Sequence, residues 1–107
     1  MRHSIFAAML TAALAVSAGA SAQDFPTRTV TMVIPFAAGG PQDTIGRVVA
    51  QRMGELLGQQ VVVENVGGAG GTIGTAQVVN AKPDGYTLVA ATPGPITISP
   101  VAQKGLS

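Results

Sequence analysis

The sequence predicts an α/β fold with a parallel β-α-β-α-β core. Two stretches, residues 30–45 and 61–74, share one order: an apolar run, a glycine-rich break and a helix-like segment. A third apolar run follows a turn that contains proline and glycine at residues 82–85. If these three runs are parallel strands, the loops that follow them gather at one edge of the sheet. Open α/β sheets bind their ligands at that edge.

The first 22 residues are typical of a secretory signal peptide. Arg2 and His3 give a basic start, residues 5–16 are apolar, and Ala20-Ser21-Ala22 matches the small-residue cleavage pattern. The apolar run is shorter than the roughly 20 residues that a membrane-spanning helix needs. We therefore expect a signal peptide over residues 1–22, export to the periplasm, and a mature chain, residues 23–107, that forms a small α/β half-domain.

The composition excludes several kinds of chemistry. The whole chain has six Lys and Arg, five Asp and Glu, one His and no Cys or Trp. Arg2 and the single His3 belong to the predicted signal, so the mature chain has a net charge of zero. Thiol and histidine catalysis and the common zinc ligand sets are then absent. We expect no catalytic residue, metal site, cofactor or nucleic-acid partner, and any anion must be held by local dipoles.

The first strand and helix have clear signals. Residues 29–36 are β-branched and apolar, as in a buried parallel strand. Gly40 is the predicted N-cap of a helix over residues 41–57, with Pro41 at its first position and Gly58 ending it. Asp43 falls in the first turn, where a carboxylate meets the positive end of the helix dipole. Arg47 and Arg52 fill a solvated face, and the predicted core stripe is Ile45, Val48, Val49, Met53, Leu56 and Leu57.

The second half of the chain repeats this order less clearly. Residues 60–65 are the second predicted strand, and residues 67–71 are a loop with four glycines. Thr72 is expected to cap a short helix that ends near residue 80, and residues 86–91 form the third strand. After Thr92 the prolines indicate a loop or a strand-to-helix transition, with no further clear element. The side chains expected to face inward from the short helix are Ile73, Ala76, Val79 and, less strongly, Val78.

The two glycine loops predict a site for an anion. Each loop leads into a helix N-terminus, which offers free backbone N–H donors and a partial positive charge. Phe36 is expected either to wall a small ligand or to pack on the first helix, and Thr92 to donate a hydroxyl to the same crevice. Asp43 is interpreted as a helix-start residue, because a carboxylate beside a bound anion would repel it.

Two other functions stay open. Residues 68–74 invite a dinucleotide interpretation, but their spacing is G-x-G-x-x-x-G and no acidic residue ends the third strand. A small Rossmann-like nucleotide-binding enzyme domain is therefore the weaker alternative. A third possibility is a secreted interaction module whose free sheet edge pairs with another chain.

Several segments together resemble the Bug-type extracytoplasmic solute receptors, the substrate-binding proteins of tripartite tricarboxylate transporters. Residues 35–43 with Arg47 resemble the family's first loop and helix, and residues 61–65, 68–71, 73–74 and 83–87 follow in the family's order. The likeness covers residues 23 to about 100. It implies part of the first lobe of a two-lobed, type II-like periplasmic binding protein, with the second lobe absent. Val66 and Gly67 stand where the family usually has an Arg-Pro pair.

The resemblance also implies a function. Family members are non-catalytic receptors that capture small carboxylates and hand them to membrane permease subunits, without inserting in the membrane themselves. In the family, the loop after the first strand cradles a ligand carboxylate, and the two later loops face the same cleft. The residues that correspond here are Phe36, Ala37, Ala38, Gly39, Gly40, Gly70, Gly71, Thr72 and Thr92, with Pro41 and Asp43 supporting the helix N-terminus.

Overall fold

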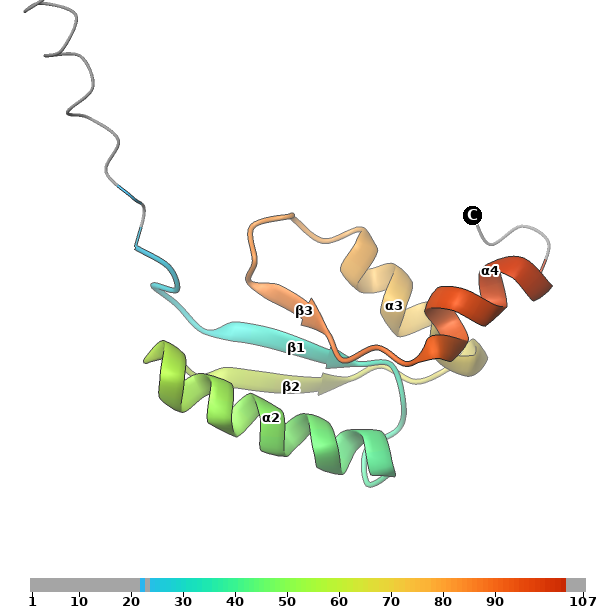
Figure 1. Cartoon of the computed structure of the whole chain (residues 1–107), viewed down its shortest axis with the longest axis horizontal. Coiled ribbons are helices and arrows are strands. Elements are labelled where there is room, and N and C mark those ends of the chain that lie inside the picture. Colours follow the sequence, from blue (N-terminus) through green and yellow to red (C-terminus); the bar gives the residue numbers. More distant parts are fainter. Residues whose placement is uncertain (1–21, 23, 104–107) are drawn as a thin grey trace, which may run out of the picture.

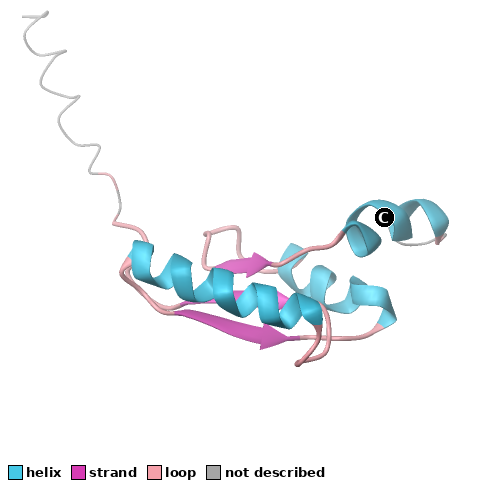
Figure 2. Ribbon diagram, turned by 60° about the horizontal axis from the view of Figure 1, so that its bottom comes forward, coloured by secondary structure: helices cyan, strands magenta, loops and turns pink. Residues whose placement is uncertain are grey.

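The computed structural model describes residue 22 and residues 24–103 (Figure 1). The predicted signal peptide, apart from Ala22, lies outside the described residues. The described part is built on a three-stranded parallel sheet in the order β2-β1-β3. In Figure 2, helix α2 (Pro41–Leu57) lies in front of the sheet and helix α3 (Thr72–Val79) behind it. The predicted α/β class and the parallel core are confirmed.

Strand β1 (Val30–Ile34) is the centre of the fold because both its edges are paired. Val30 lies opposite Val61 of strand β2 (Val61–Asn65), and Thr31 lies opposite Thr87 of strand β3 (Thr87–Val89). Side chains of β1 are almost fully buried, as expected for a central parallel strand. Strand β3 is shorter than the predicted residues 86–91. Its ladder with β1 stops after the bond from the Ala90 amide to the Val33 carbonyl, because Pro35, which follows β1, has no N–H to donate.

Helix α2 begins and ends where the sequence predicts. Gly40 is its N-cap, and Gly58 ends it in the left-handed conformation with φ of 70°. The predicted core stripe, however, is wrong: Val48 is 65% exposed and Val49 is 44% exposed. Ile45, Leu56 and Leu57 are also exposed, and only Met53 packs partly against the core.

Small residues bring α2 onto the sheet in place of the large ones. Gly46 and Ala50 are the buried positions of the helix besides Asp43. A Cβ on Gly46 would lie 2.5 Å from Cδ1 of Ile34, so a larger residue there requires the Ile34 side chain to move. Ala50 joins Val30 and Met32 in the hydrophobic core. The large apolar residues of the helix therefore lie on a face next to the one that packs on the sheet.

Helix α3 shows the same deviation. Gly71, not Thr72, is its N-cap, and the predicted inward residues Ile73, Ala76 and Val79 are exposed. Val78 is half-buried, as the weaker expectation had it. The buried position is Gly74, where a Cβ would lie 2.6 Å from the carbonyl oxygen of Val66 and 2.9 Å from Cα of Pro35. The helix contacts the backbone of β1's end directly.

The last described segment is helical, which agrees with the strand-to-helix transition, one of the two options that the sequence left open after Thr92. A wide helical turn over Gly94–Ile98 runs into helix α4 (Ser99–Ala102). Pro95 and Pro100 each fall in a first turn, where the missing N–H costs no hydrogen bond. Among the described residues, no helix is long and apolar enough to cross a bilayer.

Candidate functional site: the loop edge of the sheet

Three loops meet at the carboxyl ends of the strands. They are residues 35–40 after β1, residues 66–71 after β2 and residues 90–95 after β3; we call this region the loop edge (Figure 1). A Cβ on Gly71 would lie 3.1 Å from Cζ of Phe36 and 3.2 Å from Cγ of Pro95. A Cβ on Gly67 would lie 3.3 Å from the amide nitrogen of Ala37. The expectation that the glycine loops share one edge is therefore confirmed, and glycine is what permits the approach.

A network of side chains braces the first loop. Asp43 Oδ2 accepts a hydrogen bond from the Gly39 amide at 2.9 Å. Arg47 Nε donates to both carboxylate oxygens of Asp43, at 3.0 and 3.1 Å. Asn65, at the end of β2, donates from Nδ2 to Asp43 Oδ1 at 3.0 Å and to the Phe36 carbonyl at 3.2 Å. Arg47 Nη2 in turn donates to Asn65 Oδ1 at 3.1 Å.

This network changes the chemistry of Asp43. The side chain is buried, with 8% of its surface exposed, yet its oxygens accept hydrogen bonds from three donor groups. Its bond from the Gly39 amide, and then the bonds from Arg47 and Asn65, lower its pKa from 3.8 to about 2. The carboxylate is thus ionised at any physiological pH. Asp43 acts at the helix start as predicted, whereas Arg47 is bound to it and to Asn65 and is not a merely solvated residue.

The first loop has backbone amides that no described group occupies. None of the hydrogen bonds between described residues uses the amides of Ala37 or Ala38, whereas the Gly40 amide closes the tight turn at residues 38–39 on the Ala37 carbonyl. Ala37 and Ala38 are exposed, and Gly40 is half-exposed at the uncapped start of α2. Gly39, by contrast, has its amide occupied by Asp43. Free amides at the N-terminus of a 17-residue helix are suited to an anion.

The second loop is more self-contained than the sequence suggested. A short 3₁₀ turn, Ala69–Gly71, uses the Gly71 amide as a donor to the Gly68 carbonyl at 3.0 Å. The amide and the hydroxyl of Thr72 both donate to the Ala69 carbonyl, the hydroxyl at 2.9 Å. The exposed Gly70, with φ of 66°, is the predicted donor that this turn leaves accessible.

The third loop brings Thr92 to the same region. A Cβ on Gly94 would lie 3.9 Å both from Oγ1 of Thr92 and from the carbonyl oxygen of Gly70. Thr92 is half-buried, and its hydroxyl and the Gly70 carbonyl oxygen both lie next to Gly94. Phe36 is also half-buried and lies against Gly71, so it packs on the second loop. The two options considered for Phe36 from the sequence did not include this contact.

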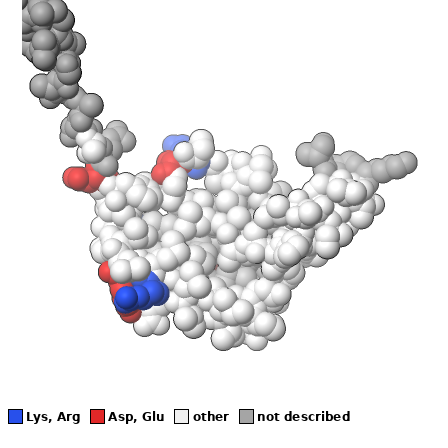
Figure 3. All heavy atoms as spheres, viewed as in Figure 1, with Lys and Arg blue, Asp and Glu red and all other residues white. Residues whose placement is uncertain are grey.

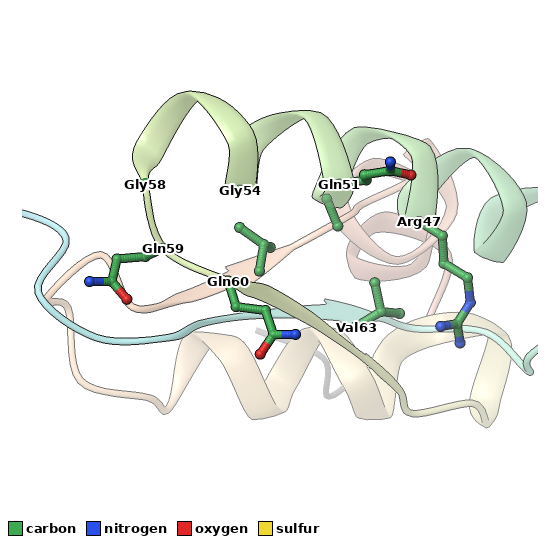
Figure 4. Close-up of a pocket in the computed structure, with 9 residues that line it drawn as sticks. Arg47, Gln51, Gly54, Gly58, Gln59, Gln60 and Val63 are labelled. Carbon is green, nitrogen blue, oxygen red and sulfur yellow. The ribbon is translucent and has the colours of Figure 1, made fainter.

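Two hollows flank α2. A polar one of about 540 Å³ lies between the helix and the outer edge of β2; Figure 4 shows Arg47, Gln51 and Gln60 around it. An apolar one of about 350 Å³ lies between the helix and β3, and Ile45 and Val49 line it with Met32. Thr92 lines this apolar groove and is the single predicted ligand residue in either hollow. Ile45 and Val49, which do not pack in the core, therefore line an apolar groove beside the loop edge.

Charge is sparse where the loops meet. On the face seen in Figure 3, the Lys, Arg, Asp and Glu side chains gather near the amino ends of the strands, and the loop edge on that face carries none. Within the described residues, no group of three His, Cys, Asp or Glu side chains is arranged to hold a metal ion. On that face, backbone dipoles and hydroxyls are the polar groups at the loop edge, and the charged groups bound to the first loop are the paired Asp43 and Arg47.

Solved structures define the class of protein. The chain superposes on a periplasmic binding protein, BugD, with a TM-score of 0.59 at 60% identity, over 61% of this chain and 22% of that one. MatC from Rhodopseudomonas palustris with bound malate gives 0.59 at 52% identity over the same shares. A second R. palustris protein, with adipate, gives 0.64 at 44% identity over 66% of this chain and 24% of that one. The fold is thus that of part of a periplasmic binding protein.

Sequence comparison defines the family. Residues 45–106 match the model of the tripartite tricarboxylate transporter family receptor, and the chain belongs to this family. A UPF0065 protein of Agrobacterium vitis is 53% identical over 81% of this chain. BugT of Bordetella pertussis is 45% identical over 69% of it. The chain spans about a quarter of the length of these relatives, which are covered to 25% and 23%. The resemblance to the Bug-type receptors is confirmed, and nothing supports the nucleotide-binding alternative.

Proposed function

We propose that this chain is a non-catalytic part of a periplasmic receptor that binds a small carboxylate at the loop edge. The observation that supports the proposal is the meeting of the three loops at one edge of the sheet. The first loop has the unoccupied amides of Ala37 and Ala38, and we place Gly70 and Thr92 of the two other loops in the same site. A carboxylate accepts several N–H bonds at once, and amides need no counter-charge to bind it. The similar structures with malate and adipate support a dicarboxylate as the ligand.

The remaining parts of the proposal follow from the family. Residues 1–22 direct export and are removed, and the mature residues 23–107 act in the periplasm as part of the first lobe. The receptor delivers its ligand to the membrane permease subunits of a tripartite tricarboxylate transporter. Because the loop amides face solvent in this chain, we expect an affinity of roughly 1 mM, far from the limit of a closed site.

Titration of the isotope-labelled chain with malate and adipate tests the proposal by NMR. The amide signals of Ala37, Ala38 and Gly70 should shift with one common dissociation constant. The turn at residues 82–85 precedes β3 at the opposite ends of the strands and should not respond. The diamide of malic acid, which lacks both charges, is the ligand control. Equal shifts with malate and with the diamide, or none with either dicarboxylate, would contradict the proposal.

The ionic strength separates amide binding from binding by charged side chains. With amides as the donors, the dissociation constant for malate should rise by no more than about threefold between 50 and 500 mM NaCl. A steeper loss would mean that Lys or Arg side chains hold the ligand.

A further inference from the structure

Asp43 is the one charged side chain among the described residues that is buried. Acidic residues in the first turn of a helix usually remain in water, where they interact with the helix dipole. Here the carboxylate turns back to the loop that precedes its own helix and accepts the Gly39 amide. Burying a charge costs free energy unless the charge is paired and hydrogen-bonded, and the bonds to Gly39, Arg47 and Asn65 meet that requirement here. A helix cap alone does not require such a buried arrangement, so the burial of Asp43 indicates a second role.

The bonds of Asp43 and Asn65 fix the loop at two points. The carbonyl of Phe36 is held by Asn65, and the amide of Gly39 is held by Asp43. Between these points lie only Ala37 and Ala38, whose amides are not used within the described chain. The short span between two anchored backbone groups leaves the loop little freedom. It thus presents its unoccupied amides in one arrangement before any ligand binds.

Arg47 offsets the negative charge that Asp43 places next to the first loop. An uncompensated Asp43 carboxylate within 2.9 Å of the loop backbone would repel an anionic ligand. Arg47 contacts both carboxylate oxygens through Nε, and Asn65 orients the guanidinium through Nη2. In Figure 4 the Arg47 side chain extends from α2 toward β2, across the end of the polar hollow. The positive charge of Arg47 is therefore paired with the Asp43 carboxylate.

We propose that Asp43, Arg47 and Asn65 form a positioning network that presets the first loop for a carboxylate, in which Arg47 neutralises Asp43 so that the loop accepts an anion. This inference rests on the proposed carboxylate-binding function. None of the three residues is assigned a contact with the ligand. The network acts through the loop backbone, and the loss of Arg47 leaves a negative charge beneath the anion site.

The variant Arg47→Gln tests the electrostatic part. The Arg47 side chain is 53% exposed, so the variant should fold. We expect its dissociation constant for malate to rise by about tenfold, the effect of one unpaired charge next to the site. The dissociation constant for a malate monoester, which carries one charge less, should rise by about threefold. A role confined to loop structure would weaken both ligands equally, and that result would overturn the electrostatic role.

The double variant Asp43→Asn with Arg47→Gln provides the rescue. With both charges removed, no unpaired carboxylate lies beneath the anion site, so the double variant should bind malate about threefold more tightly than Arg47→Gln alone. The lost bond to the Gly39 amide should keep its affinity below that of the wild type. The matched control is Arg52→Gln on the same helix, because within the described part of the chain the hydrogen-bond partner of Arg52 is the exposed Glu55, at 2.7 Å. The control should bind malate as the wild type does. A double variant no better than Arg47→Gln alone would overturn the proposal.

Hydrogen exchange of the ligand-free chain separates this inference from the proposed function. In Asp43→Asn and in Asn65→Ala, the Gly39 amide should exchange at least tenfold faster than in the wild type, while core amides of β1 stay protected. If the wild type shows no response to malate, the proposed function fails. Faster exchange at Gly39 then still supports the positioning of the loop, and unchanged exchange in both variants overturns it.

Discussion

Gly74 is the position where one added methyl group should disturb the loop edge most. The residue is the buried contact of α3, and its Cβ would lie 2.6 Å from the Val66 carbonyl oxygen and 2.9 Å from both Cα and Cβ of Pro35. Real Cβ atoms essentially never approach other atoms within 3.0 Å. The contacts include backbone atoms on both sides, so no side-chain rotation relieves them. In Gly74→Ala, α3 must move away from the end of β1.

The expected cost follows from two opposing effects. Overpacking a close contact costs about 1–3 kcal/mol. Alanine in a helix interior gains about 1 kcal/mol over glycine, and Gly74 sits in a helical conformation that alanine accepts. Because rigid backbone takes the clash, we place the overpacking near its upper range and expect a net loss of about 1–2 kcal/mol. For a domain of this size that corresponds to a fall of roughly 4–16 °C in Tm.

Urea unfolding followed by far-UV circular dichroism measures this loss. The matched control is Gly94→Ala, which also lies in a helical turn but whose Cβ would meet its nearest atoms at an ordinary 3.9 Å. The control should lose clearly less stability than Gly74→Ala, and any loss it shows reflects crowding between the alanine Cβ and the ring of the following Pro95. A Gly74→Ala variant as stable as the Gly94→Ala variant would refute the inference that direct helix-to-backbone contact sets the spacing of the two loops.

Three further predictions test other parts of the structure. The folded pKa of Asp43, about 2, lies below its ordinary 3.8, so its contribution to the free energy of unfolding is complete above that range and is lost as the pH falls from 3.8 to 2. The stability difference between wild type and Asp43→Asn should shrink over that window in urea titrations; a constant difference would contradict the pKa. Gly58 has φ of 70°, so Gly58→Ala should cost about 1–2 kcal/mol, and thermal unfolding that shows no loss would exclude the left-handed cap. Ile34→Ala should cost about 2–5 kcal/mol, whereas Val48→Ala, at a site 65% exposed, should change stability by less than about 0.5 kcal/mol in the same assay. Similar losses at both sites would mean that Val48 is buried and that the predicted apolar stripe of α2 does form the core.

Local chemistry made much of the fold predictable. The run of β-branched residues in β1 favours a buried strand. The boundaries of α2 follow from Gly40 and Pro41 at its start and from Gly58, in the left-handed conformation, at its end. The parallel arrangement then brings the glycine loops together without further information, because a β-α-β unit returns the chain to the same end.

The inward faces of the helices could not be predicted in the same way. Hydrophobic periodicity finds the largest apolar side chains, but α2 approaches the sheet through Gly46 and Ala50, which carry almost no hydrophobic signal. A line of small residues four apart was the available clue. Arg47 and Asn65 were missed as partners because their contact joins residues 18 apart in the chain. The four-residue spacing of Asp43 and Arg47 was the one local hint.

The bracing of the first loop also constrains how this stretch of chain can change length. Gly39, Asp43 and Arg47 follow one another at intervals of four residues, and the last two lie on the same side of α2. One residue inserted after Thr44 would turn Arg47 by about 100° around the helix axis and shift it by about 1.5 Å. Point substitutions on the outer side of this first turn are then tolerated, while an insertion or deletion inside it separates the guanidinium from the carboxylate. The start of the helix and the loop before it form a unit of fixed length.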